Sequence, residues 1–208
     1  EYLDPVRYIS NESSGKQGYE IAIALSKLGI TTTLITGPSN LVAPKGIKVR
    51  KIISADQMLD EVKKSLPVDL AVCAAAVTDF KPIKINQNKI KKENLNLKSI
   101  SFVKNNDILE YISKSNKNRP RLVAGFSAET ENLTKNSINK INKKHCDLIF
   151  ANDVSQKDIG FNSDYNKISV IDRTGNVKTI PKNKKSFIAN KIAQILLEKM
   201  LINDKNTN

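Results

Sequence analysis

The stretch Val68-Asp69-Leu70-Ala71-Val72-Cys73-Ala74-Ala75-Ala76 is a nearly continuous apolar run. Such a run is typical of a strand that is buried on both faces of a parallel sheet. Residues 122–126 and 147–151 are two further apolar runs of strand length. We therefore expect these three segments to be central strands of a sheet that is covered by helices on both faces.

Helical and strand patterns alternate on either side of these runs, which favours a doubly wound sheet. We expect further strands over residues 31–35, 49–53, 97–103, 167–171 and 176–180, and helices over residues 17–28, 55–66, 131–144 and 184–201, with another helix beginning near Asp107. Arg173-Thr174-Gly175-Asn176 is typical of a hairpin turn. The sequence thus predicts an α/β fold: a doubly wound, mostly parallel Rossmann-like sheet with helices on both faces, a C-terminal hairpin and a last helix. We expect one domain over residues 1–201 and a frayed tail over 202–208.

Polar residues come directly after the three apolar runs. These are Asp79, residues 127–130 and residues 152–153. Ligands of doubly wound sheets bind at the carboxyl ends of the strands. We therefore expect the functional site at this edge of the sheet.

Residues 4–18 are a polar loop, punctuated by glycine, that leads into the first expected helix. Ser10, Asn11, Ser13 and Ser14 are good N-cap residues, and Gly15 and Gly18 allow a ligand close to the backbone. A helix N-terminus binds anions through its free N–H groups. An ordinary capped helix is the alternative interpretation. A loop of this kind should follow a first strand, so we expect the chain to be a piece of a longer polypeptide.

The composition limits the classes of function. The net charge is +13, which is compatible with nucleic acid as a partner, but the lysines are spread through Lys- and Asn-rich segments and are not interleaved with aromatic residues. No apolar run is long enough to span a membrane, and the first residues do not resemble a signal peptide. Cys73 and Cys146 lack metal-ligand spacing. We interpret both as small core residues of a cytoplasmic protein.

Two common nucleotide motifs are absent. The loop Ser-Ser-Gly-Lys-Gln-Gly of residues 13–18 is not G-x-G-x-x-G, and the strand over 31–35 ends without an acidic residue for a ribose, so a dinucleotide-dependent reductase is disfavoured. Gly15-Lys16 is followed by Gln17, so it is not a P-loop. His145 has no metal-ligating neighbour in sequence, and we expect a structural role for it.

Several motifs together resemble a known family. They are residues 3–16, 74–80, 89–92, 125–130, 151–154 and 160–164. In this order and spacing they are similar to the bacterial phosphopantothenate–cysteine ligases, which form the synthetase half of the bifunctional coenzyme A biosynthesis protein. The similarity runs from Glu1 to about Leu201.

The resemblance implies a CTP-dependent ligase that uses Mg²⁺. The carboxylate of 4′-phosphopantothenate would attack the α-phosphate of CTP, and the amine of cysteine would then attack the resulting acyl cytidylate. The family also implies a homodimer and a decarboxylase domain, attached or associated. FMN would bind to that domain and not to this chain. No nucleic acid and no membrane are expected as partners. The metal ligands are not identified. A nucleotide- or nucleic-acid-binding module without catalysis is the alternative function.

Two residues are implied to be catalytic. Asn11 resembles the asparagine that handles the acyl cytidylate, with an N-cap as its alternative role. Lys89 resembles the lysine that neutralises charge on the phosphate. Lys91 and Lys92 would complete a mobile flap in the Lys-rich segment 81–94. A solvated lysine run is the alternative for this segment.

The resemblance also implies a set of ligand contacts. Ser13, Ser14, Gly15 and Gly18 would form the substrate and phosphate loop. The residues expected at CTP are Cys73, Ala74, Ala75, Asp79, Lys89, Asn106, Asp107, Ile108, Leu109, Phe126, Lys140 and Lys144. Asn106 stands where the family commonly has proline, which we expect to loosen that turn. Sheet core is the alternative for Phe126, and helix surface charge is the alternative for Lys140 and Lys144.

Overall fold

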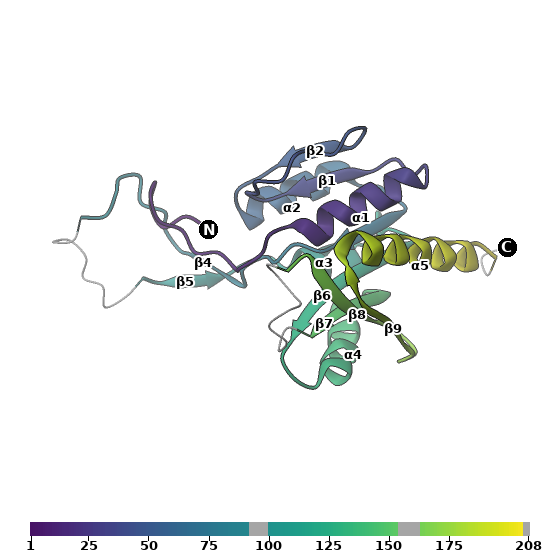
Figure 1. Cartoon of the computed structure of the whole chain (residues 1–208). Coiled ribbons are helices and arrows are strands. Elements are labelled where there is room, and N and C mark those ends of the chain that lie inside the picture. Colours follow the sequence, from purple (N-terminus) through teal and green to yellow (C-terminus); the bar gives the residue numbers. More distant parts are fainter. Residues whose placement is uncertain (92–99, 154–162, 206–208) are drawn as a thin grey trace.

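The computed structural model describes residues 1–91, 100–153 and 163–205, with only the backbone of 203–205 (Figure 1). A five-stranded sheet has the strand order β3-β6-β7-β8-β9. Its strands are β3 (Leu70–Cys73), β6 (Leu122–Glu129), β7 (Leu148–Asp153), β8 (Tyr165–Asp172) and β9 (Val177–Lys184). The first three are parallel to one another, and the hairpin of β8 and β9 adds two antiparallel strands. The predicted fold class is therefore confirmed.

The side chains of β6 and β7 are buried on both faces of this sheet. Leu122, Ala124, Leu148 and Phe150 belong to one hydrophobic cluster. Val123, which lies between Leu122 and Ala124 in sequence, belongs to a second cluster. Because successive side chains of a strand point to opposite faces, each strand contributes to two cores. This burial explains the apolar runs in the sequence.

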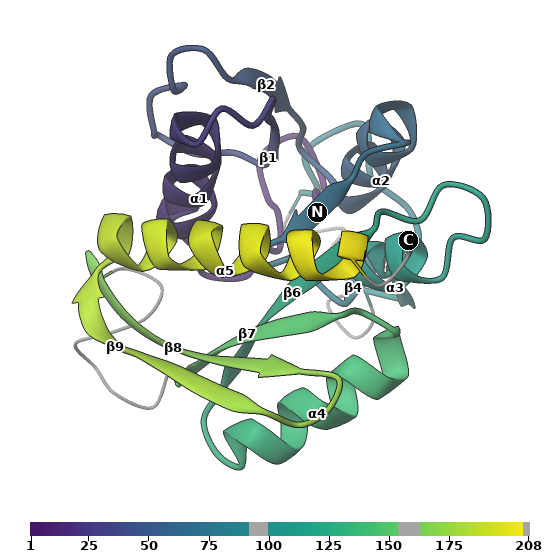
Figure 2. The ribbon, with the colours of Figure 1, turned by 90° about the vertical axis from the view of Figure 1, so that its right-hand side faces the viewer.

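Helices cover both faces, as expected. α1 (Lys16–Lys27) and α5 (Lys185–Lys205) pack on the first cluster, and α2 (Ala55–Ser65), α3 (Ile108–Ser113) and α4 (Leu133–Lys144) pack on the second. Figure 2 shows α5 and α4 on opposite sides of the strands β7 to β9. None of the described helices is long and apolar enough to cross a membrane.

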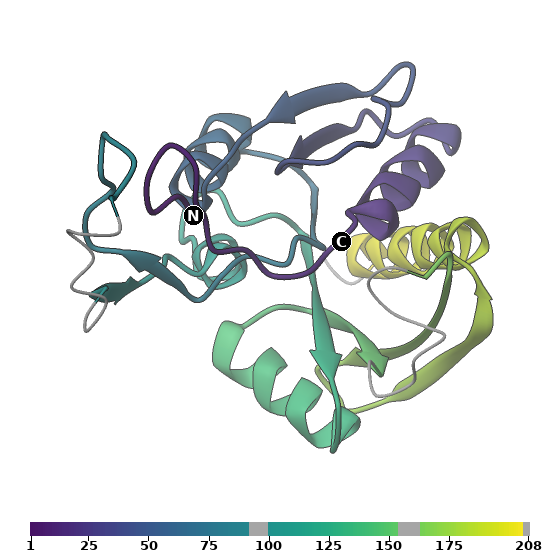
Figure 3. The same cartoon turned by 60° about the vertical axis from the view of Figure 1, so that its left-hand side comes forward.

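Two smaller sheets complete the fold. β1 (Thr33–Thr36) and β2 (Lys48–Lys51) form a parallel pair, and β4 (Phe80–Pro82) pairs antiparallel with β5 (Phe102–Lys104). The β4–β5 ribbon and the N-terminal loop project from the body of the molecule (Figures 1 and 3).

The β4–β5 ribbon differs from two expectations, one for a loop and one for a strand. The segment 81–94, expected to be a loop, begins within β4, and the strand expected over 97–103 is observed at 102–104, with residues 97–99 outside the described part. All three residues of β5 are exposed. In β4, only Pro82 is buried. A short ribbon that is largely exposed has no regular alternation of apolar and polar residues, so its strand pairing is not visible in the sequence.

Several element ends also differ from the expectation. β6 and β7 continue through the polar residues 127–129 and 152–153, which were expected to follow them, because these residues pair with each other: Ser127 with Ala151 and Glu129 with Asp153. β3 ends at Cys73, so residues 74–76 lie in a loop. α5 continues past residue 201 to Lys205, which corrects the start of the expected tail. Residues 206–208 lie outside the described part.

His145 has the structural position that the sequence suggested. It is the C-cap of α4, with a left-handed φ of 60°. Its carbonyl oxygen accepts hydrogen bonds from Arg119 and Arg173, at 3.2 and 2.6 Å. The expected hairpin turn is also present, with Gly175 at a φ of 82°.

Gly125 lies where β6 passes closest to α3. A Cβ atom at this position would lie 2.5 Å from Leu109 Cδ2 and 3.0 Å from Ile149 Cδ1. We expect Gly125→Ala to lower the free energy of unfolding by about 1–3 kcal/mol, as other overpacked cores do. Urea denaturation measures this loss. Gly18→Ala is the matched control, because its Cβ would have an ordinary contact of 3.7 Å with Ala74. Unchanged stability of Gly125→Ala would contradict the close packing.

Candidate functional site

Asn11 joins the N-terminal loop to the loop that follows β3. Its side-chain Nδ2 donates a hydrogen bond to the carbonyl oxygen of Val77, at 3.0 Å. The N-cap of α1 is Gly15, with a left-handed φ of 74° and no side-chain cap hydrogen bond. The N-cap interpretation of Asn11 and of the serines is therefore wrong. Glycine adopts this left-handed backbone conformation more readily than residues with a side chain, which explains its place at the end of the loop.

The loop after β3 is held from its other side by Asn105. The Nδ2 atom of Asn105 donates to the carbonyl oxygen of Thr78 at 3.0 Å, and its backbone N–H donates to the carbonyl oxygen of Asp79 at 2.8 Å. Asn105 is buried, and within the described part of the chain its Oδ1 atom has no hydrogen-bond partner. Two asparagine side chains thus fix the loop that carries Ala74, Ala75 and Asp79.

Sequence reasoning missed Asn105. The one local signal is its place in the polar run 105–107 directly before a helix. Such a run indicates an N-cap, and Asp107 is that cap: its Oδ1 accepts from the N–H of Glu110 at 2.8 Å. Asn106 Nδ2 lies 3.3 Å from Asp56 Oδ1, and Asp56 pairs with Lys81. The turn expected to be loose therefore has a side-chain link to α2.

Ile108 and Leu109 are buried in the second hydrophobic cluster. Their side chains pack in the core, so a ligand at the start of α3 would meet their backbone. Phe126 is half-buried, and its ring centroid lies 5.3 Å from that of Phe150. Its side chain thus packs as sheet core, which was the alternative interpretation.

Lys144 and Lys140 both come from α4 and reach other candidate residues. Lys144 Nζ lies 2.7 Å from Asp107 Oδ2 and 2.9 Å from Glu110 Oε2. Lys140 Nζ donates to the carbonyl oxygen of Phe126 at 2.9 Å. The structure therefore brings these four expected site residues, Asp107, Phe126, Lys140 and Lys144, next to one another, with both ammonium groups already bound to protein oxygens.

The ion pairs of Lys144 have electrostatic consequences. Hydrogen bonds from Lys114 and Lys144 lower the pKa of Glu110 to about 2. Burial alone would lower the pKa of Lys144, but Asp107 and Glu110 outweigh it and raise that pKa. Lys144 is therefore a fixed cation at the start of α3, where it holds Asp107 in place.

Cys73 is half-buried at the end of β3, and Cys146 is fully buried. Burial raises the pKa of Cys73 to about 12 and that of Cys146 to about 11. Both thiols are neutral at physiological pH, and a neutral thiol is a poor nucleophile. Their interpretation as core residues is consistent with this environment.

The loop that was expected to bind substrate and phosphate lies at the start of α1. Ser13 Oγ is 3.4 Å from the Gly15 nitrogen, and Lys16 Nζ forms an ion pair with Asp164 at 2.6 Å. Gly18 faces Ala74. The loop is therefore next to the residues that follow β3.

Lys89 and Lys91 are exposed on the segment after β4. This segment contacts the N-terminal loop through Ile90 and Asn86. Lys92 lies outside the described residues. Among the residues that the structure describes, no hydrogen bond or ion pair links Lys89 to the sheet-edge residues. Ile90, next to Lys89, is held by Asp4 and Arg7. Sequence reasoning gave neither of these two residues a role, although both lie in the opening motif.

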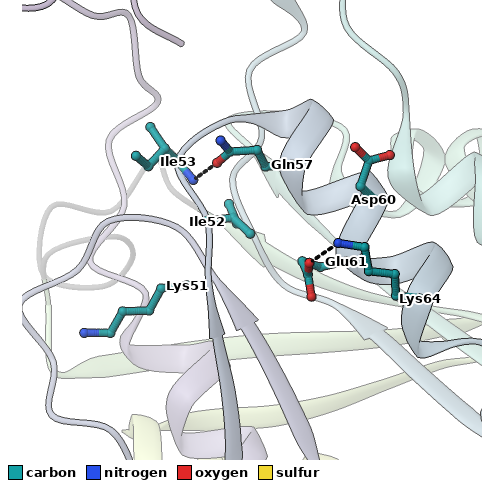
Figure 4. A pocket seen from close by; sticks show the side chains of 7 residues that line it. All are labelled: Lys51, Ile52, Ile53, Gln57, Asp60, Glu61 and Lys64. Carbon is teal, nitrogen blue, oxygen red and sulfur yellow. Dashed lines mark hydrogen bonds and ion pairs between the residues drawn. The ribbon is translucent and has the colours of Figure 1, made fainter.

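A cavity beside β2 and α2 does not coincide with the candidate residues. It has a volume of about 470 Å³ (Figure 4). Its lining residues are Lys51, Ile52, Ile53, Gln57, Asp60, Glu61 and Lys64. None of them is an expected site residue. Within the described part of the chain, no three His, Cys, Asp or Glu side chains are grouped to hold a metal ion.

The family described as "DNA/pantothenate metabolism flavoprotein C-terminal domain" matches residues 1–200. The chain belongs to this family. The resemblance found in the motifs is thereby confirmed.

The relatives that the chain matches are coenzyme A biosynthesis bifunctional proteins, CoaBC. The protein of Borreliella burgdorferi is 40% identical over 198 residues, which are 94% of this chain and 49% of that protein. The Vibrio vulnificus protein is 40% identical over 194 residues, 92% of this chain and 48% of its own length. The Escherichia coli K12 protein is 38% identical over 204 residues, 97% and 49% of the two lengths. The chain thus spans about half the length of the curated relatives it matches.

Two solved structures share the fold. The C-terminal domain of a CoaBC protein superposes with a TM-score of 0.79 and 29% identity, covering 97% of this chain and 91% of that one. A Cab2 mutant in complex with phosphopantothenate-cysteine has a TM-score of 0.77 at 14% identity, covering 99% and 84%. At that identity the second likeness concerns the fold alone.

Proposed function

We propose that the chain ligates 4′-phosphopantothenate to cysteine in coenzyme A biosynthesis, with CTP as the activating nucleotide. The observation that carries this proposal is the hydrogen bond from Asn11 to Val77. It brings an asparagine from the opening motif to the loop after β3, beside the residues expected at CTP. Membership of a family whose relatives are bifunctional coenzyme A biosynthesis proteins supports the same assignment.

The first step would form an acyl cytidylate. A carboxylate oxygen of phosphopantothenate attacks the α-phosphorus of CTP, and the bond to the β-phosphate breaks, so pyrophosphate leaves. Negative charge gathers on the phosphate during this displacement. Such a reaction depends on positioning and charge neutralisation more than on covalent chemistry. We assign the neutralising cation to Lys89.

The second step would form the amide bond. The amine of cysteine attacks the acyl carbon, the carbon–oxygen bond to the phosphate breaks, CMP leaves and the nitrogen loses a proton. A side-chain amide both donates and accepts hydrogen bonds. Asn11 can therefore donate to an oxygen of the cytidylate while it stays oriented by its environment.

We also propose that Mg²⁺ enters with the triphosphate. The described residues offer no cluster of metal-ligating side chains, and Mg²⁺ is commonly bound through substrate phosphates and water. Its chemistry would be neutralisation of the triphosphate charge.

The partners follow from the same assignment. We propose that the chain works with a decarboxylase domain, because the relatives are bifunctional and about twice as long as this chain. We also propose a cytoplasmic homodimer, as the family resemblance implies. That domain, and not this chain, would bind FMN. Exposed apolar side chains on the projecting ribbon, such as Phe80 and Phe102, support a protein contact there.

Incubation with CTP, Mg²⁺, phosphopantothenate and cysteine tests the function. We expect mass spectrometry to find phosphopantothenoylcysteine, with CMP and pyrophosphate in equal amounts. Omission of CTP should abolish the product. RNA binding with a steep salt dependence, without any pyrophosphate release, would instead favour the non-catalytic binding module.

Replacement of Lys89 tests the first step. We expect Lys89→Gln to abolish detectable acyl cytidylate formation, because loss of one stabilising contact in the transition state costs about 2–4 kcal/mol. Pyrophosphate release measures this step. Lys84→Gln is the matched control, since Lys84 is also exposed on the same segment and has no assigned role. Release at the parental rate by Lys89→Gln would mean that Lys89 is only a solvated lysine.

Replacement of Asn11 separates the two steps. We expect Asn11→Asp to retain part of the first step and to lose most of the second, because a carboxylate cannot donate a hydrogen bond and repels the anionic intermediate. Mass spectrometry should then detect phosphopantothenoyl cytidylate with little cysteine adduct. Formation of the adduct at the parental rate would remove Asn11 from the site.

A further inference from the structure

Asp4 is a charged residue in an unusual place. Its side chain has no exposed surface, although it lies in the N-terminal loop and not in either hydrophobic cluster. Burial alone would raise its pKa, but hydrogen bonds from Val6, Arg7 and Ile90 lower that pKa to about 2. Asp4 is therefore a carboxylate at neutral pH. A buried charge of this kind is tolerated only when hydrogen bonds surround it.

The oxygen atoms of Asp4 divide their contacts between near and distant residues. Oδ1 accepts from the backbone N–H groups of Val6 and Arg7, both at 2.8 Å. Oδ2 accepts from Arg7 Nε at 2.9 Å and from the backbone N–H of Ile90 at 3.2 Å. The first pair of bonds closes a local turn. The bond to Ile90 reaches a segment 86 residues away in sequence.

Arg7 completes this contact with Ile90. One of its terminal nitrogens lies 2.7 Å from Asp4 Oδ2 and donates to the carbonyl oxygen of Ile90 at 2.6 Å. The side chains of Asp4 and Arg7, here named the Asp4–Arg7 clamp, thus hold both the N–H and the C=O of one residue. A second contact lies nearby, because the N–H of Asn86 donates to the carbonyl oxygen of Leu3 at 2.9 Å.

The held residue is the neighbour of Lys89. Lys89 is exposed and projects from a segment that neither hydrophobic cluster includes. Fixing both peptide groups of Ile90 restricts the backbone on either side of it. The clamp therefore determines where the Lys89 side chain begins.

We propose that Asp4 is a positioning residue that acts through Arg7 and the backbone of Ile90 to place Lys89. This inference rests on the proposed role of Lys89 in the ligation. Misplacement of a reacting group by about 1 Å lowers a rate by up to about 100-fold, so the clamp contributes to the first step without touching the substrate.

The variant Asp4→Asn tests the proposal with two readouts. Asparagine preserves the shape of the side chain but removes the charge and one acceptor. We expect exchange of the Ile90 amide hydrogen to become at least about tenfold faster, since its partner is weakened. We expect pyrophosphate release, per folded molecule with saturating CTP, Mg²⁺ and phosphopantothenate, to fall about 10- to 100-fold.

Asp147→Asn is the matched control. Asp147 also pairs with an arginine, Arg119, and its Oδ2 accepts from the backbone N–H of Val123 at 2.7 Å. It lies at the amino-terminal ends of β6 and β7, away from Ile90. We expect this variant to lose stability but to keep Ile90 exchange and pyrophosphate release within about twofold of the parent. The reason is that different regions of a protein open independently, each with its own free energy. An equal loss of release in both variants would overturn the proposal, since it would mean a general structural effect.

Arg7→Lys covers the case in which Asp4→Asn does not fold. Lysine retains the charge but cannot bond to Asp4 and to the Ile90 carbonyl with one planar group. We expect the same faster exchange and slower release, to a smaller extent. Parental exchange or parental release in the folded variants would overturn the proposal. Parental release by Lys89→Gln would instead refute the role of Lys89, while exchange at Ile90 would still report on the clamp.

Discussion

Burial of β6 and β7 on both faces is the constraint on which the rest of the structure depends. These two strands lie between two hydrophobic clusters, one under α1 and α5 and the other under α2, α3 and α4. Because both faces require cover, the first and last helices pack on one face and the three between them pack on the other. The same arrangement brings the carboxyl ends of β3, β6 and β7 to one edge, where the polar residues gather.

The candidate site is assembled by hydrogen bonds between segments that are distant in sequence. Asn11 and Asn105 hold the loop after β3 from two sides. Asp4 and Arg7 hold the segment that carries Lys89. The N-terminal loop thus contacts both groups of candidate residues. Its role is to connect the sheet edge with the projecting ribbon, and its polar side chains bond to backbone atoms more than to one another.

The lysines that give the chain its positive charge have different surroundings and therefore different roles. The net charge is +13, but the lysines singled out by the resemblance differ in their surroundings. Lys140 and Lys144 are bound to protein oxygens, and Lys16 is paired with Asp164. Lys89 is exposed. A lysine that already neutralises a protein carboxylate organises a site, whereas an exposed lysine can approach an anionic ligand, so contacts distinguish residues that composition treats alike.

The sequence by itself determined the central strands, the five helices of the described residues and the family, because apolar runs, helical periodicity and ordered motifs are local signals. It did not determine where β6 and β7 end, since their polar last residues are strand only because each has a partner in the other strand. The pairing of β4 with β5 was also hidden, because these short and largely exposed strands have no regular burial pattern. Only the tertiary structure revealed the roles of Asp4 and Asn105. Their partners lie in other segments, and a hydrogen bond across such a separation requires the folded chain to bring donor and acceptor together.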